Sequence, residues 1–178
     1  MPVESSNRIQ LNLHRDDTVS GVILQENTED RYILSAPLCR GNVKLECEGG
    51  VVHDGNVRPG LLRLLSPGER VQITRRSRLA ALTISLPGAE FRAILAANYY
   101  KRRSIGLRPV DPILKPNCHV EALCRMLSSS NEIEDGQRQL FIDGLSYLLL
   151  ALLLEAHGRG GAANSHAKGG LTLMNPLI

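Results

Sequence analysis

Four side chains in the first half of the chain are of the types that hold a carboxylate or a sugar hydroxyl. They are Arg40, His53, Arg58 and Arg63. A guanidinium donates two parallel hydrogen bonds to a carboxylate, and an imidazole can exchange a hydrogen bond with a hydroxyl group. We predict these four as ligand-binding residues, while noting that each type is also common as a plain surface side chain.

The same residues do not form a pattern of metal or covalent chemistry. The strand-like region holds only His14 and His53, without the His-x-His pair that a metal-binding barrel of strands requires. Cys118 and His119 with Cys124 do not have the spacing of a closed zinc site. There is also no G-x-S-x-G, no Walker A and no strand-linked G-x-G-x-x-G motif. We therefore predict no enzyme activity, no catalytic residue, no metal and no cofactor.

Composition bounds the class of protein. The 178 residues are 43% hydrophobic and 22% charged, as in an ordinary folded domain, and the net charge of +3 is too small to identify a partner. Two basic clusters are not interpreted as phosphate sites: Arg75 to Arg78 is predicted to be a solvated strand end or turn, and Lys101 to Arg103 to lie near a helix C-terminus, where cations are favourable. The beginning has no secretion signal, the four cysteines form no redox motif, and no apolar run reaches membrane length. We predict a cytoplasmic protein without a membrane partner.

Residues 1–88 have the pattern of short β-strands. Apolar residues alternate with polar ones in "RIQLNL" and "NVKLECE", which is the period of a strand with one buried face. Further runs are "GVILQ", "RYILSA", "GLLRLL", "RVQIT" and "LAALTISL". Turn signals separate them at Gly49-Gly50, Asp54-Gly55, Pro59-Gly60 and Pro67-Gly68, and "VVHDG" is predicted to place His53 at a turn. Many short strands at this spacing predict a sandwich or small barrel.

Residues 89–157 have the period of helices. After Pro87-Gly88, one face of the first helix carries Phe91, Ile94, Leu95 and Asn98. Asn117 is predicted to cap the second helix. One face of this helix carries Val120, Leu123, Cys124 and Leu127 and is predicted to face the core. The three prolines of "GLRPVDPILKPN" predict a rigid connection between these two helices. The segment therefore predicts an α+β protein with two or three helices after the strands.

The third helix is predicted from near Asp135 to Gly158. Its apolar residues step by three and four along a seam formed by Ile142, Leu145, Leu149, Leu152 and Ala156. Leu148, Leu150, Leu153 and Leu154 make other sides apolar as well. A helix with several apolar faces needs more than one covering partner, so we predict a homodimer interface along the seam. The alternative is that the two shorter helices cover it completely.

Residues 158–178 differ in composition from the rest of the chain. "GRGGAANSHAKGG" has no apolar period and is typical of a flexible linker. The short apolar segment "LTLMNPLI" follows it. We expect this region to be a linker and the truncated start of a further domain.

The order of these parts resembles the N-terminal sensor and dimerisation region of AraC-type transcriptional regulators, which looks like a cupin barrel followed by helices. The better-matched stretches are "GLLRLLSPGERV", "ALTISLP", "DPILKPNCHVEALCRML", "YLLLALLLEAHG" and "KGGL". In the family, a Gly-Gly-Leu of this kind leads into the helix-turn-helix DNA-binding domain. Here "TLMNPLI" stands where that domain would begin.

The resemblance implies a fold and a function. It implies a cupin-like β-barrel over residues 1–88 that senses a small-molecule effector, a helical dimerisation segment over 89–157, and DNA binding only through a domain that is not present. Two alternatives remain open at this point. The chain could be a small cupin-type enzyme, such as an isomerase or dioxygenase, or a stand-alone inhibitor that pairs with full-length regulators.

Overall fold

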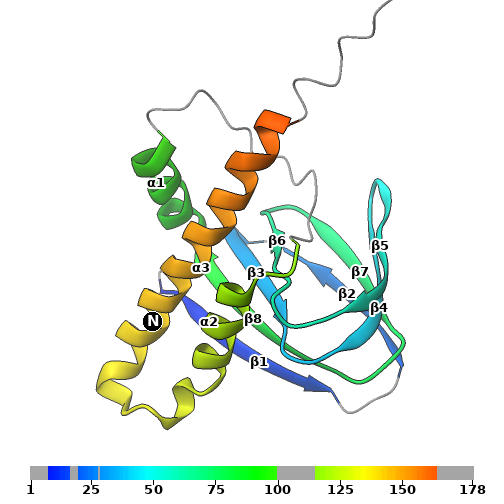
Figure 1. Cartoon of the computed structure of the whole chain (residues 1–178), viewed down its shortest axis with the longest axis horizontal. Helices are drawn as coiled ribbons and strands as arrows, with labels where there is room; N and C mark the ends of the chain where they lie inside the picture. Colours follow the sequence, from blue (N-terminus) through cyan, green and yellow to red (C-terminus); the bar gives the residue numbers. More distant parts are fainter. Residues whose placement is uncertain (1–7, 17–19, 28, 100–114, 164–178) are drawn as a thin grey trace, which may run out of the picture.

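The computed structural model describes residues 8–16, 20–27, 29–99 and 115–163, with eight strands preceding three helices (Figure 1). The strands are β1 (Gln10–Asp16), β2 (Gly21–Glu26), β3 (Arg31–Pro37), β4 (Gly41–Cys47), β5 (Gly50–Val57), β6 (Arg63–Leu65), β7 (Arg70–Arg75) and β8 (Leu79–Pro87). The helices are α1 (Gly88–Tyr99), α2 (Cys118–Ser128) and α3 (Asp135–Ala163), with a short 3₁₀ turn, η2 (Ser130–Glu132), before α3. This order confirms the predicted α+β class and the change of period at Pro87-Gly88.

The strands form two antiparallel sheets of four strands each. The first sheet has the order β1-β8-β3-β6, and the second sheet has the order β2-β7-β4-β5. Over the described residues, no strand of one sheet pairs with a strand of the other. The closed barrel is therefore not confirmed. Alternation along a strand decides which face is buried, but it does not decide which edges pair.

The prediction of a turn at His53 is wrong. His53 and Asp54 lie inside β5, opposite Leu45 and Lys44 of β4. The chain reverses at Glu48-Gly49 instead, and the register shifts between Leu45 and Glu46. The Asp54-Gly55 signal failed because Gly55 takes up its positive φ of 150° within the strand, without reversing the chain.

The two Pro-Gly turns are confirmed. Gly60 and Gly68 have φ angles of +88° and +80°, as the third position of a type II turn requires. Gly60 is also in close contact with the start of α2: a Cβ there would lie 2.7 Å from the carbonyl oxygen of Asn117. The predicted cap is confirmed too, since Asn117 Oδ1 accepts hydrogen bonds from the N–H groups of His119 and Val120 at 2.8 and 3.4 Å.

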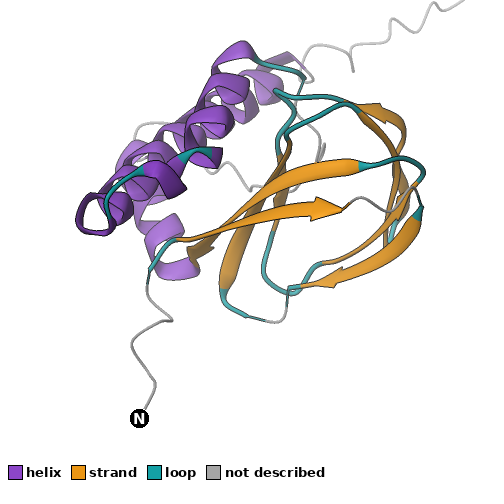
Figure 2. Cartoon of the chain, turned by 90° about the horizontal axis from the view of Figure 1, so that it is seen from below, coloured by secondary structure: helices purple, strands orange, loops and turns teal. Residues whose placement is uncertain are grey.

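The helices cover one face of the first sheet (Figure 2). Strands β3 and β8 pair so that Leu34 lies opposite Ile84 and Ala36 opposite Leu82. These side chains form one core with Phe91 of α1 and with buried residues of all three helices. A second, smaller core lies between the two sheets and includes Val43, Leu45, Val57, Leu61, Leu65 and Val71. The molecule therefore has three layers, with helices, first sheet and second sheet in that order.

Most residues of the seam predicted on α3 are at least partly buried within their own chain. Ile142, Leu145 and Leu149 are buried in the core shared with the first sheet, and Leu152 is half-buried. The side chain of Ala156 lies outside the described residues. A dimer contact through Ile142, Leu145 and Leu149 would require these side chains to move out of the core. The dimer interface at these positions therefore stays a prediction.

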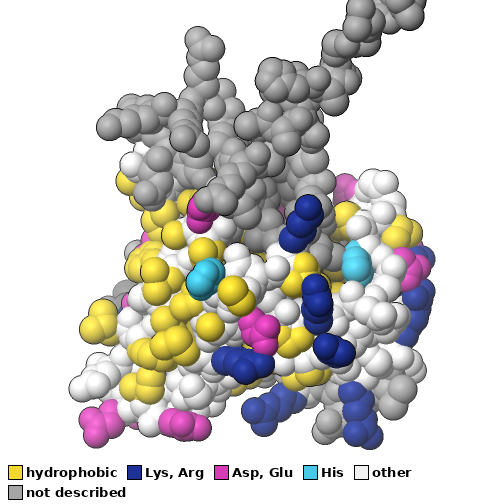
Figure 3. Space-filling view, in the orientation of Figure 1, with side chains coloured by type: hydrophobic (Ala, Val, Ile, Leu, Met, Phe, Trp, Pro, Cys, Tyr) yellow, Lys and Arg dark blue, Asp and Glu magenta, His cyan; other side chains and the backbone are white. Residues whose placement is uncertain are grey.

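A neighbouring face of α3 is exposed instead. Its members are Leu140, Gly144, Tyr147, Leu148 and Ala151, and Leu140 and Leu148 are 77% and 54% exposed. The Tyr147 hydroxyl donates a hydrogen bond to Glu90 of α1 at one border of this face. That carboxylate raises the pKa of Tyr147 to about 12. We call these five residues the exposed α3 face; hydrophobic side chains gather on the helical side of the molecule in Figure 3.

Helix α3 runs to Ala163, five residues beyond the end predicted at Gly158. The glycines there do not end the helix in the structure, so the first part of the predicted linker is helical. The rest of the linker, the final "KGGLTLMNPLI", the basic cluster at Lys101 to Arg103 and residues 106–114 of the predicted rigid connection lie outside the described residues. The side chain of Asn98 lies outside them as well.

Over Asp135–Glu155, α3 is long and apolar enough to cross a membrane by length and composition alone. The core helix of a folded domain meets the same criterion. Leu149, Leu150 and Leu153 are completely buried in the core that α3 shares with the first sheet. Packing within the chain therefore accounts for much of this apolar character.

Two adjacent leucines test this packing. Leu149 is 0% exposed and Leu148 is 54% exposed, so Leu149→Ala leaves a cavity in the core whereas Leu148→Ala does not. We expect Leu149→Ala to lower the free energy of unfolding by about 2–5 kcal/mol and Leu148→Ala by less than about 0.5 kcal/mol. Urea denaturation at low protein concentration measures both values, and similar losses for the two variants would contradict the orientation of α3.

Candidate functional site

The first candidate site is a cavity of about 540 Å³ between the two sheets. Its size is in the range of sites for small molecules. Lining residues from the first sheet include Ser35, Arg63, Ala81 and Thr83, and those from the second sheet include Gln25, Val43, Leu45, Ile73 and Arg75. Exposed residues His14 and Arg15 of β1 and Leu24 of β2 also line it. We infer that the cavity opens between these two edge strands.

The first sheet has two chemically different faces, and the cavity lies on the more polar one. Ser35 is opposite Thr83 on β8 and opposite Arg63 on β6. The residues next to them in sequence, Leu34 and Ile84, belong to the helix-facing core. The small and hydroxyl-bearing side chains on the inner face fill less space than leucines would, which leaves room between the sheets.

Arg63 is one of two buried arginines that line this space. It is only 8% exposed, and its Nη2 donates to Gln25 Oε1 at 2.6 Å and to Ser35 Oγ at 3.4 Å. Its Nη1 is buried and has no hydrogen-bond partner among the described residues. A buried N–H group without an acceptor is unfavourable, so this nitrogen offers unused hydrogen-bonding capacity to a ligand.

Burial lowers the pKa of the Arg63 guanidinium to about 10, and the nearby Cys47 and Glu69 partly oppose this effect. Glu69 is itself occupied, because its Oε2 accepts a hydrogen bond from the Ser66 N–H at 2.6 Å. The lowered pKa means that burial disfavours the charged form of Arg63 in the folded state. Arg63 thus lowers stability at neutral pH, and this loss diminishes only as the pH rises through about 10.

The other three predicted ligand-binding residues lie elsewhere. Arg40, His53 and Arg58 line a separate surface hollow of about 790 Å³ together with Pro116, ahead of α2. His53 is half-buried, and its Nε2 has no hydrogen-bond partner among the described residues. Val57 and Leu61 line both spaces and form the wall between them. The structure therefore brings three of the four predicted residues together and places Arg63 apart from them.

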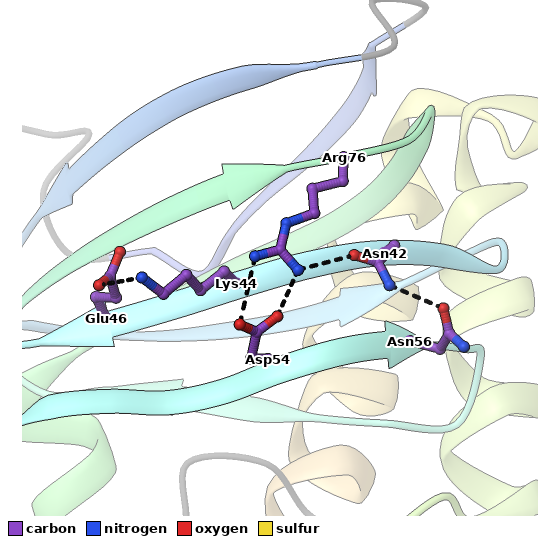
Figure 4. Close-up of polar contacts among 6 residues, drawn as sticks. All are labelled: Asn42, Lys44, Glu46, Asp54, Asn56 and Arg76. Carbon is purple, nitrogen blue, oxygen red and sulfur yellow. Dashed lines mark hydrogen bonds and ion pairs between the residues drawn. The ribbon is translucent and has the colours of Figure 1, made fainter.

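The predicted arginine cluster is divided between two faces of the second sheet. Arg75 is buried and lines the cavity, whereas Arg76 points to the outer face and forms an ion pair with Asp54 at 2.5 Å (Figure 4). That contact lowers the pKa of Asp54. Nearby, Asn42 Nδ2 donates a hydrogen bond to Asn56 Oδ1 at 3.0 Å. Only Arg76 and Arg78, which follow the end of β7, are exposed and fit the predicted solvated surface.

The predicted site did not include four polar residues that line the cavity, Gln25, Ser35, Arg75 and Thr83. A polar residue that alternates with leucines, such as Ser35 in "RYILSA" or Thr83 in "LAALTISL", is ordinarily assigned to solvent. Here the opposite face meets another sheet. The available signal was the small size of Ser35 and Ala81, which are not the long charged residues expected on a solvated face.

The described residues contain no group of three His, Cys, Asp or Glu side chains placed to hold a metal ion. Cys124 is buried among apolar residues, and burial raises its pKa to about 12. It is a core residue there.

Comparison with solved structures reveals the same arrangement in transcription regulators. The AraC-like transcriptional activator CuxR matches with a TM-score of 0.55 and 13% identity, over 83% of this chain and 52% of that protein. The chain shares its fold with AraC-like regulators. ToxT from Vibrio cholerae, solved with (E)-4-(8-methylnaphthalen-1-yl)but-3-enoic acid, matches with a TM-score of 0.55 and 13% identity, over 86% of this chain and 58% of ToxT.

A ligand-free ToxT variant also has a TM-score of 0.55, at 11% identity, over 99% of this chain and 62% of its own. The chain thus spans between half and two thirds of the length of these AraC-like proteins. The similar structures are regulators and not enzymes, and the resemblance found in the sequence is confirmed at the level of fold. Neither a protein-family model nor a curated protein sequence matches the chain.

Two buried arginines provide a test of the role of Arg63. Arg31 is 6% exposed and donates to Ser85 Oγ, Ser85 O and Arg8 O, whereas Arg63 has a nitrogen without a partner. We expect Arg31→Met to lose about 1–3 kcal/mol of unfolding free energy, because it leaves partly buried acceptors without a donor. Arg63→Met should match or exceed the wild type, because it removes a poorly solvated charge.

Urea denaturation at neutral pH compares the two variants with the wild type. A loss for Arg63→Met as large as that for Arg31→Met would show that Arg63 is needed for folding, which argues against a binding role.

Proposed function

We propose that the chain is the ligand-sensing and dimerisation module of an AraC-like transcription regulator, which controls transcription through an attached helix-turn-helix domain. The cavity between the sheets, within a fold shared with AraC-like regulators, is the observation that carries this proposal. The chain's span of about half the length of those regulators is consistent with a module that works with further domains.

The cavity is the proposed effector site. It joins both sheets, it contains the buried Arg63, and its opening lies between the edges of β1 and β2. ToxT was solved with a small organic acid bound, which supports a small-molecule effector for a protein of this fold. Arg40, His53 and Arg58 remain a second proposed contact group, in the hollow on the other side of Val57 and Leu61.

The exposed α3 face is the proposed homodimer surface. Leu140, Gly144, Tyr147, Leu148 and Ala151 follow the spacing of one side of a helix, and small residues at two of these positions permit close approach of a second helix. A second copy of the chain presents the same stripe, so a two-fold axis matches apolar residues with each other. This places the dimer contact beside the buried seam of Ile142, Leu145 and Leu149.

The two surfaces have a physical connection. Strands β3 and β8 present Ser35 and Thr83 to the cavity and Leu34 and Ile84 to the helical core. A ligand that shifts these strands therefore acts directly on the packing of α3. Regulation requires that the ligand bind one arrangement of α3 more tightly than another.

Substitutions of exposed apolar residues test the dimer. We expect the full chain to sediment as a dimer and Leu148→Glu to sediment as a monomer, because two buried carboxylates would face each other across the axis. Met126→Glu, which replaces a 46% exposed residue on α2, should leave the dimer intact. Sedimentation velocity over a range of concentrations checks all three, and a monomeric wild type would refute the dimerisation part of the proposal.

A reporter assay tests the regulatory role of the module. We expect residues 1–178, fused to a DNA-binding domain that represses only as a dimer, to restore repression of a reporter gene. Leu148→Glu should abolish repression and Met126→Glu should retain it, at equal protein levels measured by immunoblot. Absence of repression by the wild-type fusion would contradict the proposal.

A further inference from the structure

The two buried arginines in the lining of the cavity differ in what they already contact. Arg75 makes an interaction of its own, and it extends from the second sheet past Gly21, where a Cβ would lie 3.0 Å from Arg75 Nη2. Arg63 comes from the first sheet, and its Nη2 donates hydrogen bonds to Gln25 and Ser35. Its buried Nη1 therefore has hydrogen-bonding capacity that the described residues do not use.

The charged residues in the described lining of the cavity all carry positive charge. Arg15, Arg63 and Arg75 line it, whereas no Asp or Glu occurs among the described residues that line it. Most other lining side chains are aliphatic and include Val43, Leu45, Val57, Leu61 and Ile73. A neutral apolar molecule would leave Nη1 without an acceptor, and a highly polar molecule would lose its hydration against the aliphatic wall.

We propose that the cavity takes an apolar monocarboxylate, with the carboxylate accepting hydrogen bonds from Arg63 and the hydrocarbon part lying against the aliphatic wall of the second sheet. This inference rests on the proposed sensing role and names the ligand class for that site. A carboxylate fits because its oxygens are strong acceptors for the unused Nη1 of Arg63, and its negative charge opposes the positive charge of the buried arginines in the lining.

The lowered pKa of Arg63 agrees with this assignment. Burial shifts it to about 10, so the cation remains at neutral pH but is poorly compensated by its surroundings. A bound carboxylate supplies the missing negative charge, and ion pairs are stronger in the low-dielectric interior of a protein than in water. Binding should therefore raise the pKa of Arg63 and stabilise the fold.

Calorimetric titration of the full chain with octanoate and octanol tests the inference, because the two compounds differ in the carboxylate and share the chain length. We expect octanoate to bind at least about tenfold more tightly than octanol. Arg63→Met should weaken octanoate by about 10- to 100-fold and leave octanol unchanged. Arg63→Lys should lose part of the affinity, because an ammonium keeps the charge but not the geometry of the guanidinium.

Two further variants locate the site. Arg70→Met removes an exposed arginine that pairs with Glu26, outside the cavity, and should bind octanoate like the wild type. Ala81→Leu places a larger side chain in the cavity and should weaken both compounds. Thermal unfolding of each variant shows whether it is folded, so a loss of binding is attributable to the site.

The outcomes separate the ligand class from the sensing role. Equal affinities for octanoate and octanol, both lost in Ala81→Leu, would keep the cavity as a sensor and overturn the carboxylate. Octanoate binding that survives Arg63→Met or Ala81→Leu would overturn the assignment to Arg63 in this cavity, as would no detectable binding of either compound. Tighter binding of octyl phosphate than of octanoate would replace the carboxylate by a phosphate monoester. The sedimentation and reporter assays do not depend on any of these results.

Discussion

The first sheet has to satisfy different neighbours on its two faces. On one face, Leu34, Ala36, Leu82 and Ile84 meet the helices, and this contact buries a continuous apolar layer. On the other face, Ser35, Ala81 and Thr83 look across an incompletely filled space to the second sheet. A strand alternates its side chains, so most residues of β3 and β8 serve either the helix-facing core or the lining of the cavity, while Ala36 contributes to both. The position of α3 and the shape of the cavity both depend on this sheet.

Arg63 illustrates how a site can oppose the stability of its own fold. Removing a guanidinium from water is unfavourable, and the low pKa of this group reflects that effect. Arg31 is equally buried but is matched by three oxygen acceptors, which makes it a structural residue of the first sheet. Burial alone therefore does not distinguish the two arginines. The difference lies in the acceptors that surround them.

Helix α3 combines two kinds of apolar surface. Its inner side packs on the first sheet through Leu149, Leu150 and Leu153, whereas Leu140 and Leu148 remain exposed on another side. Its apolar residues occur on so many sides that the sequence pattern does not single out an inner face. Because the same strands line the cavity and support α3, the proposed sensor and the proposed dimer surface are separated by a single sheet.

Sequence alone determined the order of strands and helices, the Pro-Gly turns, the capped start of α2 at Asn117, and the resemblance to AraC-like regulators. These features are local, since period, turn residues and caps act over a few neighbouring positions. Tertiary structure decided which edges pair, that His53 lies in a strand, which side of α3 is covered, and that Arg63 lies apart from Arg40 and Arg58. These features depend on contacts between residues far apart in the chain. The periodic pattern of a strand or helix gives the direction of each side chain but not the neighbouring element that it contacts.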